Sequence, residues 1–249
     1  MKVIILAAGS GSRLGSITEN IPKPLVEING RSIIERQIDI FQNNGISDIV
    51  IITGAKKEKF NIKNISYVYD SEYYKHDQLG SLIAAYLELS GELLITFGDI
   101  LFDEHILEQI LSNSSNFAIA VDLNWTKSYE KRIDNPIELA GKVLIKDEKI
   151  REFSENLPIE KEGCLIGEFL GIIKIGKLYT PILQKYLLQL KKNHKGKFHD
   201  AESFECAKIT DFLQELLESN IDITPIFING KWCEIDTLQD LEIAKEQFL

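Results

Sequence analysis

The sequence of 249 residues predicts an α/β fold, in which a mixed and mostly parallel sheet carries helices on both faces. Two observations lead to this prediction. Short apolar runs recur along the first half, as expected for strands that are buried on both sides. Between them the apolar residues return at helical spacing, and an alternation of strands with amphipathic helices is typical of such sheets. The apolar runs are KVIIL, DIVIIT, ELLITF and FAIAV.

The elements of the first half follow one another in a regular order. Lys2–Leu6 predicts the first strand. Ser32 and Glu35 have the spacing of a capping box, so a helix is expected to begin at Ser32 and to end at Gly45. Further strands are expected over residues 48–53, 66–69, 92–97 and 117–121, and further helices over residues 79–87 and 106–111.

The second half has a looser pattern, and its first segment, residues 122–136, is polar and aromatic. We expect a hairpin over 143–153, strands over 167–175 and 224–228, and helices over 179–190 and 209–217. Residues 191–200 are basic and polar and predict a mobile loop, and a second capping box at Thr237 opens the last helix. No repeat or linker divides the chain, so one domain over residues 1–249 is predicted, with halves 1–122 and 123–249.

Composition and charge exclude several classes of function. The chain is 44% hydrophobic and 27% charged, and its formal net charge is −10. This sign of charge argues against nucleic acids and anionic membranes as partners. No apolar run is long enough to cross a bilayer, and the N-terminal run is too short for a signal peptide. The three cysteines are odd in number and lack metal-site spacing, which indicates free thiols and a cytoplasmic location. We expect a monomer or a homodimer.

A loop rich in glycine and serine, AAGSGSR, directly follows the first strand. In open parallel sheets ligands bind beyond the carboxyl ends of the strands, and a glycine-rich turn lets the backbone approach a phosphate closely. Gly9, Gly11 and Gly15 do not have the spacing of a dinucleotide-binding fingerprint, and no Gly-Lys-Ser/Thr follows as in a P-loop. A simple tight turn is the alternative interpretation of this loop alone.

The longer string LAAGSGSRL, followed by PKPL, resembles the nucleotidyltransferases, or pyrophosphorylases, which join a nucleoside triphosphate to a phosphorylated acceptor. The resemblance implies a Rossmann-like fold of the nucleotide-diphospho-sugar transferase type. It also implies a nucleotide-binding half over residues 1–122 and an acceptor and metal half over residues 123–249. The residues that it assigns to the nucleotide here are Leu6, Ala7, Ala8, Gly9, Ser10, Gly11, Ser12, Arg13 and Lys23.

Arg13 and Lys23 are the two cations of this region. The resemblance implies that Arg13 and the loop backbone hold the triphosphate and that Lys23 lies on the α-phosphate side. Phosphoryl-type transfer depends mainly on positioning and charge neutralisation, which fits both roles. A surface ion pair is the alternative for Arg13, and a solvated turn for Lys23. Prolines on both sides of Lys23 stiffen its backbone and favour a fixed cation.

Two distant aspartates, Asp99 and Asp236, are assigned by the same resemblance to the catalytic metal, which we expect to be Mg²⁺. Asp99 follows the buried run ELLITF, and Asp236 precedes the last helix. Mg²⁺ binds few protein carboxylates and keeps water or substrate oxygens. Helix capping is the alternative role for each aspartate, although Thr237 can serve as the cap beside Asp236. Glu234 lies two residues away, and strand alternation puts it on the same face.

Several segments of the second half are similar to the small cytidylyltransferases that act on choline phosphate, 2-aminoethylphosphonate or phosphoglutamine and supply bacterial surface decoration. These segments are AVDLNWTKSYEKRIDNP, IGEFLGIIKI and GKWCEIDTLQDLEIA, together with TFGDILFDEHILEQIL. The resemblance implies that CTP reacts with a small phosphate or phosphonate and that pyrophosphate is released. Base recognition is expected near Thr53 and Gly54 and along Asp77, Gln78, Gly80 and Ser81. Related enzymes often carry Asn or Ser where Asp77 and Gln78 stand here.

The acceptor pocket is expected to involve Trp125, Arg132, Asn135, Glu168, Trp232 and Glu234. Arg132 would hold the acceptor phosphate, the two tryptophans would stack against a cationic amine, and Glu168 would pair with that amine. Core packing is the alternative role for the tryptophans. Glu168 interrupts an apolar strand, and an unpaired buried carboxylate is costly. No full aromatic cage is visible, which favours an amino-bearing phosphonate or a phosphoglutamine-like acceptor over phosphocholine.

Two other functions compete with this interpretation. A sugar-1-phosphate nucleotidyltransferase that uses UTP, dTTP or GTP would share the glycine loop, Lys23 and both aspartates, and a panel of nucleotides would separate it. A non-catalytic nucleotide-binding regulator would be expected to lack the lysine or one of the aspartates, and all three are present.

Overall fold

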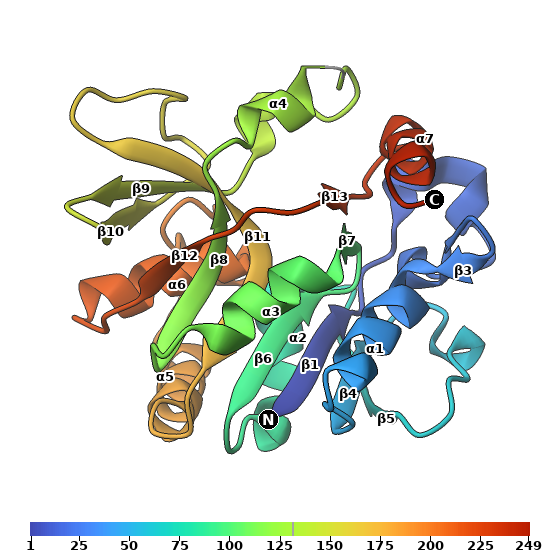
Figure 1. Ribbon diagram of the computed structural model, residues 1–249. Coiled ribbons are helices and arrows are strands. Elements are labelled where there is room, and N and C mark those ends of the chain that lie inside the picture. The colour runs from blue at the N-terminus through green and yellow to red at the C-terminus, as the bar shows by residue number, and fades with distance from the viewer. Residues whose placement is uncertain (131) are drawn as a thin grey trace.

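The computed structural model describes residues 1–130 and 132–249, and nine strands of this part of the chain form one mixed sheet (Figure 1). The strand order is β10-β9-β11-β6-β1-β4-β5, and β8 pairs with both β11 and β12. Pairing is parallel among β6, β1, β4 and β5, whereas β11 runs antiparallel to β6, β8 and β9. The strands are β1 (Lys2–Ala7), β4 (Ile49–Thr53), β5 (Ser66–Tyr69), β6 (Leu93–Phe97), β8 (Phe117–Asp122), β9 (Lys142–Lys146), β10 (Lys149–Phe153), β11 (Leu165–Ile175) and β12 (Thr224–Phe227).

The helices confirm most of the sequence-based expectations. Both predicted capping boxes are formed, one by Ser32 with Glu35 and one by Thr237 with Asp240. The α-helices are α1 (Ile33–Asn43), α2 (Gln78–Ala84), α3 (Glu104–Ser112), α4 (Thr126–Tyr129), α5 (Thr180–Asn193), α6 (Ile209–Glu218) and α7 (Leu238–Gln247). Short 3-10 helices are η1 (Ser12–Thr18), η2 (Lys23–Leu25), η3 (Lys57–Lys59), η4 (Tyr86–Glu88), η5 (Ile137–Leu139) and η6 (Phe204–Cys206).

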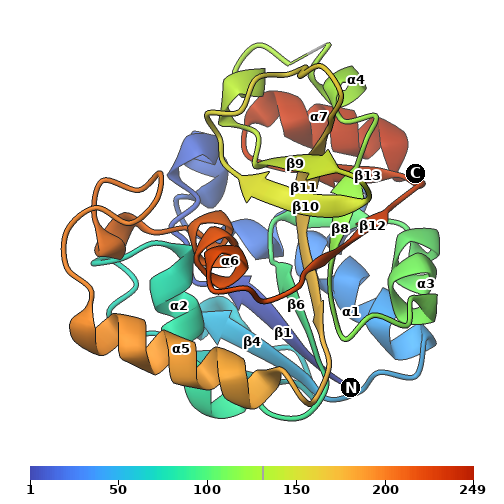
Figure 2. The same ribbon diagram turned by 90° about the vertical axis from the view of Figure 1, so that its left-hand side faces the viewer.

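Each face of the sheet is covered by its own helices, as Figure 2 shows. Along β1, Ile4 and Leu6 face α2, α5 and α6, whereas Val3 and Ile5 face α1 and α3. This division follows from the period of two in a strand, which sends alternate side chains to opposite faces. The central strand β1 is therefore apolar on both sides and covered on both faces. A ligand can approach it at its carboxyl end.

Two small sheets lie beside the main one, and the second of them positions the site. One pairs β2 (Glu27–Ile28) with β3 (Arg31–Ser32). The other pairs β7 (Ile100–Phe102) with β13 (Trp232–Glu234), antiparallel. The N–H of Ile235 donates to the carbonyl of Asp99 at 3.0 Å, which extends this pairing. Segments more than a hundred residues apart in sequence are thus held side by side (Figure 1).

The expectation of a mobile loop over residues 191–200 is corrected in part. Helix α5 continues to Asn193, and Phe198 is buried against α6 and its neighbours. The carboxylate of Asp200 accepts hydrogen bonds from the hydroxyl of Ser154 at 2.7 Å and from the side-chain amide of Asn156 at 3.0 Å. Phe198 and Asp200 therefore anchor a segment whose basic composition alone suggested full exposure. No helix of residues 1–130 or 132–249 is long and apolar enough to span a membrane.

Candidate active site

The glycine loop packs directly against Lys23 at Gly11. Gly11 adopts φ +67°, a left-handed conformation that glycine tolerates, and a Cβ there would lie 2.9 Å from the Cβ of Lys23. The hydroxyl of Thr18 donates to the carbonyl of Gly11 at 2.7 Å and fixes the loop from the other side. Gly11 is therefore required by both its conformation and its close approach to Lys23.

Lys23 lies between two carboxylates in the short helix η2, with Pro22 at its N-cap and Pro24 in its first turn. Its ammonium is 2.8 Å from Asp99 Oδ2 and also forms an ion pair with Asp236 Oδ1. Burial opposes the charge, but the neighbouring carboxylates outweigh that penalty and raise the pKa of Lys23 above its ordinary value. Lys23 is thus a fixed cation, and the alternative of a solvated turn does not fit its burial.

Arg13 approaches the same aspartate from the solvent side. Its guanidinium Nη1 lies 2.8 Å from Asp236 Oδ2, and its side chain is 59% exposed. Asp236 therefore receives one cation on each oxygen. Because the Arg13 side chain is exposed, it is free to turn toward an anionic ligand.

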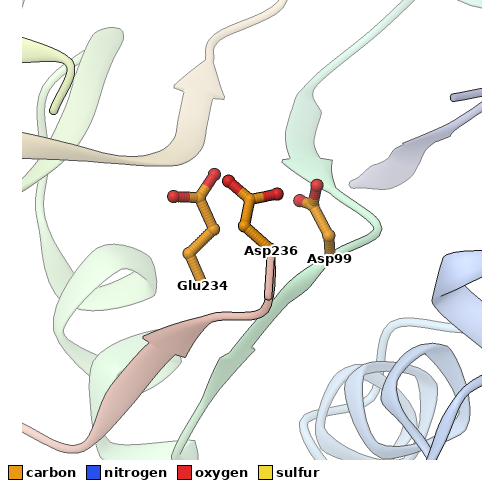
Figure 3. Close-up of side chains that lie close together, drawn as sticks. All are labelled: Asp99, Glu234 and Asp236. Atoms are coloured by element: carbon orange, nitrogen blue, oxygen red, sulfur yellow. The ribbon is translucent and has the colours of Figure 1, made fainter. Parts of the chain in front are cut away.

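Three carboxylates converge beside these cations, as Figure 3 shows for Asp99, Glu234 and Asp236. One oxygen from each lies within 4.8 Å of the others. Burial and the charges of Asp236 and Asp99 raise the pKa of Glu234 to about 8. Asp99 Oδ1 is buried and finds no hydrogen-bond partner in the described part of the chain. A cluster of hard oxygen donors with such mutual repulsion fits a divalent cation, and Mg²⁺ prefers these ligands.

The first cavity, about 280 Å³ in volume, lies over the carboxyl ends of β1 and β6. It adjoins the carboxylate cluster through Asp99 and Asp236. The predicted nucleotide residues that line it are Leu6, Ala7, Ala8, Gly9, Ser10, Gly11, Ser12, Arg13, Lys23, Asp77, Gln78 and Ser81. Most of the loop and helix residues predicted from the sequence therefore surround one space.

Three predicted nucleotide residues do not line this cavity. Thr53 is buried, and its hydroxyl lies 3.4 Å from the carbonyl of Val68. A Cβ at Gly54 would lie 2.4 Å from the carbonyl oxygen of Ala8, and one at Gly80 would lie 2.2 Å from the ring of His76. These positions support the cavity wall from behind, and their contact with a nucleotide stays a prediction.

The same wall contains a polar group that sequence reasoning missed. Asp70 is buried at the end of β5, and it accepts a hydrogen bond from the hydroxyl of Ser81 at 2.9 Å. His76 Nε2 lies 3.2 Å from the other oxygen of Asp70, and His76 and Tyr73 line the cavity. The available signal was the position of Asp70, an acid directly after a strand whose carboxyl end faces the ligand side of the sheet.

A second cavity, about 190 Å³ in volume, adjoins the first and leads into the second half of the chain. Arg13, Asp77, Gln78, Phe97 and Asp236 line both cavities, so they form the boundary. Of the predicted acceptor residues, Asn135, Glu168, Trp232 and Glu234 line it. Glu234 therefore belongs both to this cavity and to the carboxylate cluster.

Glu168 is the buried acid of the second cavity. It lies on β11 and is only 3% exposed, and the hydroxyl of Tyr129 donates to its Oε1 at 2.6 Å. Its Oε2 has no hydrogen-bond partner among the residues described. Burial raises the pKa of Glu168 to about 7, although the Tyr129 hydrogen bond opposes that shift. A buried acceptor atom in a polar cavity is available to a donor on a ligand.

The other two predicted acceptor residues lie outside this cavity. Trp125 is 1% exposed, packs edge to face on Tyr129, and donates from its indole to the carbonyl of Ile166 at 3.1 Å. It fills the small core beside α4, as the alternative interpretation of this tryptophan expected. Arg132 is paired with Asp240 at 2.9 Å and faces the back of the carboxylate cluster. Its contact with an acceptor phosphate is not tested by this arrangement.

Lys208 is a cation of the second cavity that the sequence did not single out. Its ammonium forms an ion pair with Glu155 Oε1 at 2.5 Å, and both residues line the cavity. The carbonyls of Glu205 and Ala207 accept hydrogen bonds from the N–H groups of Asp77 and Leu79. The segment before α6 is thus joined to the start of α2, a pairing that no local sequence pattern predicts.

A family model described as the MobA-like NTP transferase domain matches residues 3–154. The CTP:phosphoglutamine cytidylyltransferase of Campylobacter jejuni is 28% identical over 260 residues, which cover 99% of this chain and 100% of that protein. The bifunctional protein GlmU of Methanococcus vannielii is 31% identical over 262 residues, 100% of this chain and 55% of its own. The choline-phosphate cytidylyltransferase of Streptococcus pneumoniae is 37% identical over 123 residues, 48% of this chain and 53% of its own. The matches to the Methanococcus and Streptococcus proteins thus cover about half the length of each of those two relatives.

Solved structures confirm the predicted fold. The CTP:phosphocholine cytidylyltransferase of Streptococcus pneumoniae superposes with a TM-score of 0.71 at 21% identity, over 98% of this chain and 97% of that one. The inositol-1-phosphate CTP transferase of T. maritima gives a TM-score of 0.70 at 18% identity, over 100% of this chain and 97% of that one. At these identities the likeness concerns the fold alone, a mixed sheet flanked by helices of the nucleotide-diphospho-sugar transferase type.

Proposed function

Because the chain belongs to the MobA-like NTP transferase family and is a nucleotidyltransferase, we propose that it transfers CMP from CTP to a small phosphate or phosphonate acceptor. The observation that carries this proposal is the junction of the two cavities at Arg13 and Asp236. Each cavity would bind one substrate. Where the cavities meet, the cations can neutralise the nucleoside triphosphate and the anionic acceptor while the two react. The full-length similarity to a phosphoglutamine cytidylyltransferase supports CTP as the nucleotide.

In this proposal the first cavity holds the triphosphate. Backbone N–H groups of the glycine loop, with Arg13 and Lys23, neutralise the phosphate oxygens. Asp99, Asp236 and Glu234 would hold Mg²⁺, which supplies charge neutralisation to the phosphates when bound. Release of Lys23 and Arg13 from the aspartates makes both cations available to the nucleotide.

The acceptor binds in the second cavity with its oxyanion directed toward the boundary. That oxyanion attacks the α-phosphorus of CTP, a new phosphorus–oxygen bond forms, and the bond to the β-phosphate breaks. Pyrophosphate leaves with the electron pair of the broken bond. The acceptor is already an anion at neutral pH, so no strong general base is required.

Glu168 supports an acceptor that carries an amino group. Its Oε2 is a buried carboxylate oxygen without a hydrogen-bond partner in residues 1–130 and 132–249, and a primary ammonium would give it both a hydrogen bond and a countercharge. A trimethylammonium group has no N–H to donate and is best held by several aromatic faces. Phe97, Tyr129, Phe169 and Trp232 line the cavity, so its aromatic faces do not separate the two kinds of head group, and the Oε2 of Glu168 is the feature that favours an N–H donor. We therefore favour 2-aminoethylphosphonate or a phosphoglutamine-like acceptor over phosphocholine.

The setting that we propose follows from this chemistry. The cysteines Cys164, Cys206 and Cys233 are free thiols, which supports a reducing, cytoplasmic location. The product would be an activated small amino compound, and its transfer to cell-surface polysaccharide is the proposed purpose. Whether the chain acts as a monomer or as a homodimer stays a prediction.

Pyrophosphate release with Mg²⁺ tests the proposal, in a panel that crosses CTP, UTP, dTTP and GTP with acceptors. The acceptors are 2-aminoethylphosphonate, glutamine phosphate, phosphocholine and several sugar-1-phosphates. We expect release with CTP and one amino-bearing acceptor. Release only with UTP, dTTP or GTP and a sugar-1-phosphate would instead establish the competing function.

A further inference from the structure

The guanidinium of Arg132 is buried behind the carboxylate cluster. Its Nε lies 2.9 Å from Asp240 Oδ1, and the two side chains are 2% and 0% exposed. A buried ion pair is costly to form, because both charges leave water. The charge of Asp240 offsets that penalty, and the pKa of Arg132 is raised although burial alone would lower it.

This ion pair reaches the backbone of both metal-ligand candidates on the last strand. Arg132 Nη2 donates to the carbonyl oxygen of Glu234 at 3.1 Å. Asp240 Oδ2 accepts from the N–H of Asp236 at 3.1 Å and from the N–H of Thr237 at 2.9 Å. Residues 234–237 are therefore fixed at both ends by one arginine–aspartate pair.

Arg132 also contacts the wall of the second cavity. Its Cζ lies 4.9 Å from the ring centroid of Tyr129, whose hydroxyl donates to Glu168. The guanidinium thus lies behind both the carboxylate cluster and the buried acid of the acceptor cavity. Its guanidinium is held by Asp240 and by the carbonyl of Glu234, and Arg132 does not line the second cavity.

We propose that Arg132 is a positioning residue, which holds Glu234 and Asp236 in the orientation that binds the metal through Asp240 and the Glu234 carbonyl. The inference rests on the proposed function, in that these carboxylates hold the metal. It is an alternative to the prediction that Arg132 binds the acceptor phosphate, and the test below separates the two roles. Partners that orient metal ligands in this way commonly change metal affinity about 10- to 100-fold when they are removed.

The test compares Arg132→Met and Asp240→Asn with Arg151→Met, which removes an arginine from an exposed ion pair with Asp147. Mn²⁺ is titrated into the protein saturated with CTP, or with the nucleotide preferred in the panel above, and thermal unfolding is followed. We expect the Mn²⁺ midpoint to rise at least about tenfold in both site variants. Arg151→Met should keep the wild-type midpoint.

Turnover gives the second readout. If Arg132 positions the carboxylates, the Mg²⁺ requirement rises and kcat falls while the acceptor KM stays within about twofold of wild type. A raised acceptor KM in Arg132→Met, with unchanged Mn²⁺ and Mg²⁺ dependence, would overturn the inference and restore Arg132 as an acceptor ligand. Asp240→Asn separates the positioning role from acceptor binding, because Asp240 does not line the second cavity.

Two further variants keep the test decisive. Arg132→Met with Asp240→Asn removes both buried charges, so it avoids the unpaired charge that could prevent a single variant from folding. We expect the double variant to bind Mn²⁺ no more weakly than the worse single variant, since both act through one pair. Asp236→Asn should weaken the metal response strongly. If Asp236→Asn responds to Mn²⁺ as the wild type does, or if the wild type does not respond to Mn²⁺, the metal site itself is contradicted and the inference with it.

Discussion

The Lys23 ammonium lies between Asp99 and Asp236, where burial opposes its charge and the carboxylates stabilise it. No bound anion is needed to explain why Lys23 is charged, because the chain supplies both counterions. A nucleotide would exchange these partners for phosphate oxygens. In the proposed function the same carboxylates would then be released to a metal, so that Lys23 would link metal binding to nucleotide binding.

Lys23→Met tests that role. We expect kcat to fall roughly 100- to 1,000-fold, the usual effect of removing one preorganised charged donor from a reacting centre. The fold should persist, because the methionine keeps the volume of the buried stem. Steady-state pyrophosphate release and circular dichroism check both points, with the exposed Lys59 changed to Met as the control. Turnover at the wild-type rate would remove Lys23 from the mechanism.

Glu168, in the second cavity, makes the stability of the protein depend on pH. Its pKa in the folded protein is about 7, above the ordinary value of 4.5. Between these two values the folded state holds a proton that the unfolded state has lost, so the free energy of unfolding falls as pH rises. The loss is complete above about pH 7. Binding of an ammonium group to the ionised acid offsets it.

Glu168→Gln should therefore change both stability and acceptor binding. At pH 8 the variant is expected to be more stable than wild type by on the order of 3 kcal/mol, and at pH 4.5 about as stable. Urea unfolding at both pH values measures this difference. The KM for an amino-bearing acceptor should rise in the variant, most strongly above pH 7. A KM for the acceptor that is equal in both proteins at pH 8 would remove Glu168 from the acceptor site.

At the scale of elements, the pairing of β7 with β13 and the start of α7 bring the carboxylates together. Thr237 caps α7 and shares Asp240 with the N–H of Asp236. Ser32 caps α1 with the same type of capping box but lies outside both cavities. The two caps form a matched pair, one beside the carboxylate cluster and one apart from it.

Thr237→Ala and Ser32→Ala should each lower the free energy of unfolding by about 0.5–2 kcal/mol, the usual cost of a lost N-cap. Only Thr237→Ala is expected to raise the Mg²⁺ concentration that supports half-maximal turnover, because it loosens the segment that carries Asp236. Denaturant unfolding and Mg²⁺ titration of turnover make the comparison. Equal Mg²⁺ responses in the two variants would count against a role for α7 in orienting Asp236.

Local sequence patterns predicted the helices and strands better than the tertiary contacts between them. The apolar runs of β1, β4, β6 and β8 and both capping boxes were readable from sequence, because their signals lie within a few residues. The contact of Arg132 with Asp240 and the position of Trp125 in a small core were not, since both depend on which face of α4 packs inward. Four residues of α4 are too few for a periodic pattern to decide this.

At the scale of the whole molecule, the formal net charge of −10 contrasts with the cations gathered at the glycine loop. In the proposed function Arg13 and Lys23 would attract a polyphosphate once they leave the aspartates that now pair with them, although the protein as a whole repels anions. The strands, helices and glycine loop of the first half were predictable from sequence, and the family match over residues 3–154 includes them, while the role of residues 1–122 as a nucleotide-binding half stays a prediction. The second cavity was less predictable, because its walls come from α4, β11, the segment before α6 and β13, which are distant in sequence.

The central claim is that CMP moves from CTP to a small amino-bearing acceptor at the junction of the two cavities. Transfer of label tests it most directly, in parallel reactions with [α-³²P]CTP and [γ-³²P]CTP, Mg²⁺ and 2-aminoethylphosphonate or glutamine phosphate. We predict that the α-label appears in the acceptor product and the γ-label in pyrophosphate. The γ-label in orthophosphate or in the acceptor, or transfer only from UTP, dTTP or GTP to a sugar-1-phosphate, would contradict the account.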